Sequence, residues 1–160
     1  MSAPITSLSG ATLPLTPEQR AVASQNPGFV PWSVRVILPG PVSDEALAHA
    51  SAWLHRRHGV LTHAFGPVDG FRGWRQQPQP QPVGVSTTEP LLQVARVSSP
   101  DADMHQAVGR TVLCLTVHPL AADAGSLHVL AADLARALGG RHEAGLVDEE
   151  PFQYEQFIAW

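Results

Sequence analysis

The sequence contains no lysine, because all ten of its basic residues are arginine. Without lysine the chain cannot form a Schiff base with a carbonyl substrate, and it cannot hold a phosphate with a P-loop lysine. It also has a single cysteine, Cys114, which excludes an internal disulfide. Because Cys114 lies in an apolar run, and a reactive thiol needs exposure and a positive environment, we expect it to be a buried core residue.

Charge is scarce as well. Charged residues make up 15% of the chain, and the formal net charge is −4. No basic patch indicates a nucleic-acid partner, and no acidic run indicates a charged tail. No apolar run approaches the roughly 18 residues of a membrane span, and the N-terminus lacks the charged-then-apolar pattern of a signal peptide. We therefore expect a cytoplasmic protein that binds neither membrane nor nucleic acid.

Motifs for metal and cofactor binding are also missing. The sequence contains no GxGxxG, P-loop, GxSxG or CxxC pattern. His55 and His58 have an i, i+3 spacing that could present two imidazoles to a metal, but no nearby carboxylate or cysteine completes a ligand set. We expect them to favour the negative end of a helix dipole, and we expect no metal and no cofactor.

The hydrophobic pattern predicts alternating helices and strands in one domain of 160 residues. Two helix starts are marked. One is Thr16 before Pro17, with Gln19 at the third helical position as in a capping box, and the other is Ser43 before two acidic residues. Strands are predicted at 33–38, 60–65, 71–77, 91–97 and 112–117, with the second and third forming a hairpin, and a last helix at 125–138. This order indicates an α/β fold, a single two-layer lobe in which helices pack on a mixed, open sheet.

The stretch 112–126 is the most informative part of the chain. Its apolar run predicts a buried strand that stops at Pro119, because proline has no N–H to give to a sheet. Asp123 or Ser126 can cap the helix that follows. A strand that delivers polar groups into a loop at the start of a helix is a common place for chemistry.

Four segments, in this order along the chain, resemble motifs of one protein family. They are LPLTPEQ at 13–19, HGVLTHAF at 58–65, EPLLQV at 89–94 and YEQFIAW at 154–160. They are similar to the PLT/S-x-x-Q opening, the RH-x-x-LRT-x-F segment, the GPLLRV strand and the YADYAVW helix of nonribosomal peptide synthetase condensation domains. The chain therefore resembles the N-terminal lobe of such a domain, and this implies a chloramphenicol-acetyltransferase-like fold.

This resemblance divides the chain into two parts. Residues 13–160 match a partial condensation-like domain, and residues 1–12 are expected to be a flexible N-terminal segment. The sequence stops at Trp160 in an aromatic run, so we expect that more protein originally followed.

The stretch 112–126 then aligns with the active-site motif of the family, HH-x-x-x-DG. The motif positions fall on His118, Pro119, Asp123 and Ala124, with Gly125 one place after the expected glycine. The family uses the second histidine to promote attack of an amine on an acyl thioester, and in this chain that position is Pro119. The family arginine that pairs with the aspartate falls on Gln93.

These replacements predict that the motif has no catalytic residue. Pro119 has neither a titratable side chain nor an N–H, so it can neither position an amine nor handle its proton. Neighbours on a strand face opposite sides, so His118 should turn to the core as a hydrogen-bonded structural residue. Asp123 lacks its arginine, and we expect its carboxylate to cap the helix or to reach solvent, because an unpaired buried carboxylate is costly.

The resemblance implies a function in nonribosomal peptide or hybrid polyketide biosynthesis, as part of antibiotic or other secondary metabolism. In the family the active site lies in a tunnel between two lobes, and this chain accounts for one of them. Our leading hypothesis is a non-catalytic domain that acts as a structural or docking module beside an adenylation domain or another assembly-line protein. Two alternatives stay open: half of a split acyltransferase completed in trans by a C-terminal lobe, and a domain that recruits a tailoring enzyme.

Overall fold

The computed structural model describes residues 12–25, 29–79, 84–85, 90–98, 103–105 and 109–139. The predicted N-terminal segment, apart from residue 12, and the aromatic segment 151–160 lie outside the described residues. The elements are β1 (Leu13–Pro14), α1 (Pro17–Ser24), β2 (Trp32–Pro39), α2 (Asp44–Arg57), the 3₁₀ helix η1 (Gly59–Thr62), β3 (Ala64–Pro67), β4 (Trp74–Gln77), β5 (Gly84–Val85), β6 (Leu92–Arg96), β7 (Arg110–Val117) and α4 (Ser126–Leu138).

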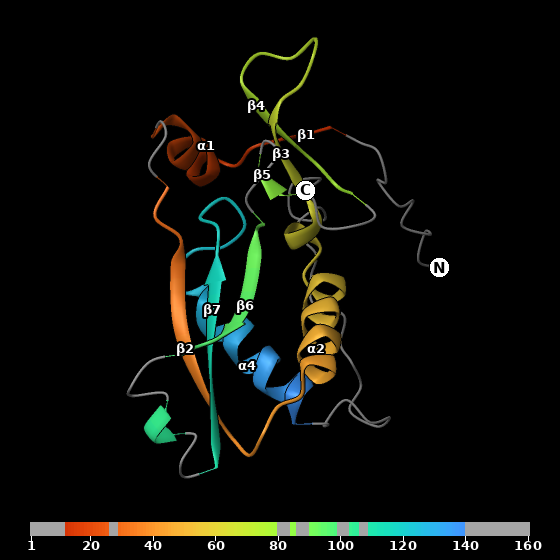
Figure 1. Ribbon diagram of the computed structural model, residues 1–160. Helices are drawn as coiled ribbons and strands as arrows, with labels where there is room; N and C mark the ends of the chain where they lie inside the picture. Colours follow the sequence, from red (N-terminus) through yellow and green to blue (C-terminus); the bar gives the residue numbers. More distant parts are fainter. Residues whose placement is uncertain are drawn as a thin grey trace, which may run out of the picture.

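One part of the fold is a three-stranded antiparallel sheet with the strand order β2-β7-β6 (Figure 1). The central strand β7 pairs with a neighbour along both edges. Along β7, Leu113, Leu115 and Val117 are fully buried, whereas Cys114 and Thr116 between them are partly exposed. One face of this sheet therefore carries the core, and we call the opposite face, with Cys114 and Thr116, the outer face.

Helices α2 and α4 cover the core face of this sheet (Figure 1). As the sequence predicts, α2 is capped by Ser43, whose Oγ accepts the N–H of Ala46 at 3.1 Å. Its residues Ala50 and Leu54 are buried in the same cluster as the β7 side chains. From α4 the cluster receives a stripe at helical spacing, made of Leu127, Leu130 and Leu134.

A second sheet has four strands in the order β1-β4-β3-β5. β3 and β4 form the predicted hairpin, with Ala64 opposite Gln77, whereas β5 runs parallel to β3. The predicted α/β class, with helices packed on a sheet, is confirmed. The strands are divided between two sheets, however. The mixed sheet is the four-stranded one, which has short strands and contains the parallel β3–β5 pair; we call it the small sheet.

Two local predictions are wrong. The strand predicted at 60–65 begins only at Ala64, because η1 occupies most of that range. There the N–H of Leu61 donates to the His58 carbonyl at 2.9 Å, so this backbone group is satisfied by the local turn instead of a strand ladder. Cys114 is partly exposed instead of buried, because it points to the outer face of β7.

A buried carboxylate joins the two helices. Asp133 of α4 is 4% exposed, and it accepts hydrogen bonds from Arg57 Nε at 3.0 Å and from His58 Nε2 at 2.9 Å. It also pairs with Arg136 of its own helix. Burial lowers the pKa of His58, although the hydrogen bond to Asp133 acts in the opposite direction. At neutral pH the imidazole is therefore an uncharged donor, and two arginines balance the carboxylate.

We expect the substitution Asp133→Asn to lower the free energy of unfolding by about 3 kcal/mol, because it leaves partly buried arginines without their counter-charge. Chemical denaturation of the purified chain measures this loss. Asp44→Asn is the matched control: its carboxylate lies 2.8 Å from Arg96 Nη2 but is 95% exposed. That exposed pair should contribute no more than about 1 kcal/mol, and equal losses in the two variants would contradict the role given to Asp133.

The lowered pKa of His58 predicts that stability depends on pH. The ordinary pKa of a histidine side chain is about 6.5, and the folded state binds the proton of His58 more weakly than the unfolded chain does. The free energy of unfolding should therefore fall as the pH drops through 6.5 toward the lower pKa of the folded state, and His58 should add no slope above that window. Urea denaturation over this pH range is compared between the wild type and His58→Gln. The variant should lose this part of the slope, and an unchanged slope would refute the assignment.

Candidate functional site

The site predicted from the sequence lies where β7 ends. The backbone N–H of His118 donates to the Leu91 carbonyl at 2.9 Å, which continues the pairing with the β6 side of the sheet for one more residue. The His118 carbonyl then accepts the N–H of Ala121 at 2.9 Å, so the chain turns at once. Pro119 lies inside this turn, where no N–H is needed. The predicted strand stop at Pro119 is confirmed.

His118 is directed into the protein. Its side chain is 3% exposed, and its ring contacts the ring of Phe29 edge-on, with the centroids 4.9 Å apart. Its Nδ1 accepts the backbone N–H of Leu120 at 3.2 Å. This hydrogen bond uses the imidazole to hold the loop that contains it, because the acceptor belongs to the same turn as the donor. His118 is therefore buried and hydrogen-bonded, as the sequence predicts. Alternation along β7 places it on the side of Cys114 and Thr116, however, so its burial depends on Phe29 and on the turn that follows the strand.

Asp123 caps the helix start and lies at the surface. Its Oδ1 accepts the backbone N–H of Ser126 at 2.7 Å and the Ser126 hydroxyl at 2.6 Å. The hydroxyl bond first, and then the backbone bond, lower the pKa of this carboxyl. Of the two predicted capping residues, Asp123 is therefore the acceptor, and Ser126 is its donor. Ala124 and Gly125 lie in the exposed turn between them.

The aligned residues do not form one polar cluster. Gln93 is exposed on the outer face, opposite Thr116, and the structure describes no hydrogen bond from it to His118 or Asp123. Pro119 is half-buried and offers only ring carbons at the position where the family has an imidazole. The two polar side chains predicted at this site, His118 and Asp123, thus form separate local hydrogen bonds.

A series of buried polar side chains supports the loop after β7 from the side of α1 and the small sheet. His63 and Gln76 are fully buried, and His63 Nδ1 lies 3.0 Å from Gln76 Oε1. Gln76 Nε2 donates to Gln19 Oε1 at 3.2 Å and to the Pro14 carbonyl at 2.7 Å. Gln19 Nε2 in turn donates to the Leu120 carbonyl at 2.8 Å. The small sheet and α1 are thereby tied to the loop after β7.

The sequence alone does not predict this series of hydrogen bonds, although it holds a partial signal of one member. Gln19 was assigned only to the capping box of α1, and that box is present: Gln19 Oε1 accepts the Thr16 N–H at 3.0 Å. His63 stands where the resembled motif has a threonine, and this difference marks the position as unusual. Its partner Gln76 lies 13 residues further on, across the hairpin, where no local pattern points to it.

The two histidines with metal-like spacing do not converge. His55 Nδ1 bonds to the Ser51 carbonyl at 2.8 Å, whereas His58 bonds to Asp133. Within the described ranges no group of three or more histidine, cysteine, aspartate or glutamate side chains could hold a metal ion. The helices described there also include none that is long and apolar enough to cross a membrane.

No protein-family model matches the sequence, and no curated protein matches it either. Solved structures do match the fold. The starter condensation domain of rhizomide synthetase RzmA matches with a TM-score of 0.70 and 15% identity, over 93% of this chain and 43% of that one. The SgcC5 protein from Streptomyces globisporus matches with a TM-score of 0.65 and 22% identity, over 92% of this chain and 41% of that one. The X-domain from teicoplanin biosynthesis matches with a TM-score of 0.62 and 23% identity, over 92% of this chain and 37% of that one.

These matches define the class of the fold. The chain has the fold of one lobe of a condensation-like domain, as the resemblance of its motifs implied. It spans about two fifths of the length of the structures that it matches. At these identities the likeness concerns the fold, so the activity must be argued from the residues at the end of β7.

We expect Asp123→Ala to lower the free energy of unfolding by about 1 kcal/mol, because α4 loses the acceptor for its first-turn donors. Thermal or urea unfolding measures the loss. The difference from the wild type should shrink in acid, as the pH falls through the lowered pKa of the carboxyl and the acceptor becomes protonated. Asp69→Ala, in the exposed turn after β3, is the control and should change little. A loss that persisted unchanged in acid would contradict the capping role.

Proposed function

We propose that the chain is a non-catalytic, partial condensation-like domain that serves as a structural or docking module in nonribosomal peptide or hybrid polyketide biosynthesis. The observation that carries this proposal is the pair His118–Pro119. The residue at the strand end is a proline, and the imidazole beside it is buried and accepts a hydrogen bond from its own loop. The fold supports the assignment to condensation-like domains, and His118 and Pro119 support the proposed absence of acyl-transfer activity.

The chemical requirement makes this argument specific. Transfer of an acyl group from a thioester to an amine needs a group that orients the amine or takes up its proton. A buried Nδ1 that already accepts the Leu120 N–H is engaged in holding the loop. For His118 to act on a substrate, the turn 118–121 would have to open and break this bond. Asp123 is likewise engaged by Ser126, with its pKa lowered, so it is a poor proton acceptor near neutral pH.

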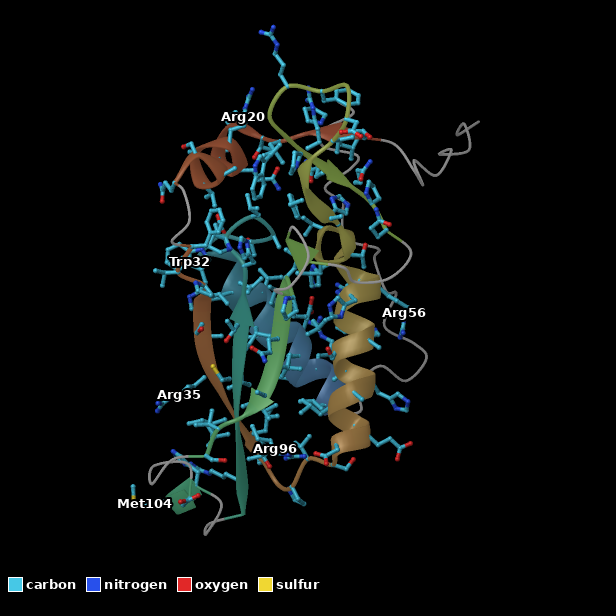
Figure 2. The ribbon with its side chains drawn as sticks, turned by 45° about the horizontal axis from the view of Figure 1, so that its top comes forward. Arg20, Trp32, Arg35, Arg56, Arg96 and Met104 are labelled. Atoms are coloured by element: carbon cyan, nitrogen blue, oxygen red, sulfur yellow. The ribbon has the colours of Figure 1, made fainter. Side chains whose placement is uncertain are left out.

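The outer face of the β2-β7-β6 sheet supports a docking role. Helices cover only the other face in the part of the chain that is described (Figure 1). The outer face carries small and uncharged side chains from all three strands, together with Ile37, which is 48% exposed, and Arg35, which projects from β2 (Figure 2). An apolar residue on a flat, weakly charged sheet is suited to contact with another protein. We assign this face to the assembly-line partner, an adenylation domain that is adjacent or separate.

The second candidate function is half of a split acyltransferase. It is favoured by one observation, that the matched structures are more than twice as long as the segment this chain covers. A lobe supplied in trans would cover the outer face and would have to provide the missing proton-handling group. Recruitment of a tailoring enzyme, the third candidate, uses the same face with a different partner.

A transfer assay with aminoacyl-loaded carrier proteins separates these candidates. We expect no condensation product from the chain alone, and none when a separately produced C-terminal condensation lobe is added, because Pro119 supplies no imidazole. Product that appears with the added lobe would instead support the split enzyme. Turnover that is lost in His118→Ala would refute the non-catalytic proposal.

Co-purification tests the docking role. An adenylation domain from the same biosynthetic system should co-purify with the wild-type chain and should be released by Ile37→Asp, which places a charge on the outer face. Val129→Asp is the matched control, because Val129 is 55% exposed on α4, on the helical side of the domain. Retention of the partner by Ile37→Asp, or its loss in both variants, would contradict the assigned face.

A further inference from the structure

A cavity lies between helix α1 and the β3–β4 hairpin, apart from the loop after β7. Its volume is about 330 Å³, and three arginines line it: Arg20 from α1, and Arg72 and Arg75 from the hairpin. Leu15, Ala23 and Trp74 supply apolar lining. Figure 2 shows Arg20 at the end of the molecule where α1 and the hairpin meet, far from Arg35 and Arg56. Among the described residues, no carboxylate lines the cavity.

These three arginines differ from those that stabilise the fold. Arg57, Arg96 and Arg136 each form an ion pair with an aspartate. Within the described ranges, none of the three cavity arginines has such a partner. The carboxylates nearest in sequence are Glu18 on α1 and Asp69 in the hairpin turn, and both are exposed. A chain with a net charge of −4 thus places three arginines around one cavity, and no carboxylate of the described residues forms an ion pair with them.

The setting of Arg75 shows that this concentration is built into the fold. Its guanidinium carbon lies over the Phe71 ring, 4.8 Å from the centroid, which orients the group. Its Nε is buried and has no hydrogen-bond partner in the structure. A buried donor without a partner costs free energy, so the fold holds Arg75 beside the cavity in spite of this cost. Gly73, with φ of +76°, makes the sharp bend between Arg72 and Arg75 that brings both to the cavity.

The chemistry of the lining selects the ligand. Guanidinium groups present parallel N–H donors that match the oxygens of a phosphate or a carboxylate. The summed positive charge of three guanidinium groups exceeds the negative charge of one carboxylate. It is better balanced by a phosphate monoester, which carries about −1.5 to −2 at neutral pH. The apolar lining beside them, with Trp74, suits a flat organic group attached to that phosphate.

We infer that the cavity formed by Arg20, Arg72 and Arg75 is a binding site for a small organic phosphate monoester. The phosphate lies among the three guanidinium groups and accepts from their N–H donors, and the organic part packs against Trp74. The site is independent of the loop at Pro119, so it can exist whether or not the chain is a docking module.

Phenyl phosphate is the probe, and titration calorimetry with the full chain measures its binding. We expect a Kd of about a millimolar or tighter, weaker binding of inorganic phosphate, and no binding of benzyl alcohol. Arg72→Gln should weaken binding of phenyl phosphate at least about tenfold, since one charge-assisted contact is lost. Arg72 is exposed, so this variant should fold normally, and raising the salt concentration should weaken the wild-type interaction.

Arg35→Gln is the matched control, because Arg35 is exposed and has no ion pair among the described residues, but lies on the outer face. It should bind phenyl phosphate like the wild type. No binding of phenyl phosphate, or equal binding by the wild type and Arg72→Gln, would overturn the site. Equal binding of benzoate would overturn the choice of phosphate. Tighter binding of a phosphoserine peptide than of phenyl phosphate would overturn the small-molecule occupant.

Discussion

The structure depends on the pairing of β7 along both edges with its apolar face fully buried. A strand in this position must pair its N–H and carbonyl groups with its neighbours, because the strands along both edges exclude water from them. The condition is met as far as the N–H of His118. Pro119 then removes the next donor, so the chain must leave the sheet and the loop to α4 must begin there. Where the polar residues of the motif lie is a consequence of this stop.

The loop is held independently of any catalytic group. His118 Nδ1 and Asp123 Oδ1 each accept a backbone N–H within three residues, and Gln19 binds the Leu120 carbonyl from α1. None of these bonds involves the side chain of residue 119. A proline at that position is therefore compatible with all of these hydrogen bonds.

Short sequence patterns predicted the features that depend on residues close together in the sequence. The cap of α2 by Ser43, the capping box of Thr16 and Gln19, and the stop at Pro119 each depend on residues within a few positions of one another. The Asp133 cluster joins residues 75 and 76 positions apart, and the Gln19–Leu120 bond spans 101 positions. Such contacts are set by the packing of α2 on α4 and of α1 on the loop, and a single sequence does not reveal that packing. Cys114 was misplaced for a related reason: an apolar run does not say which residues face outward.

The arginines discussed above form two groups: those that pair with an aspartate, and those around the cavity, which have no such partner among the described residues. Arg57 and Arg136 surround a buried carboxylate, where their charge is needed to keep Asp133 in the core. Arg20, Arg72 and Arg75 stand in a group whose charge no described residue balances, and one of their donors is buried without an acceptor. Because a fold gains nothing by leaving such a donor unmatched, that end of the chain is better explained by recognition than by stability. Together with the exposed Ile37 and Arg35 on the outer face, this favours a domain that acts by binding.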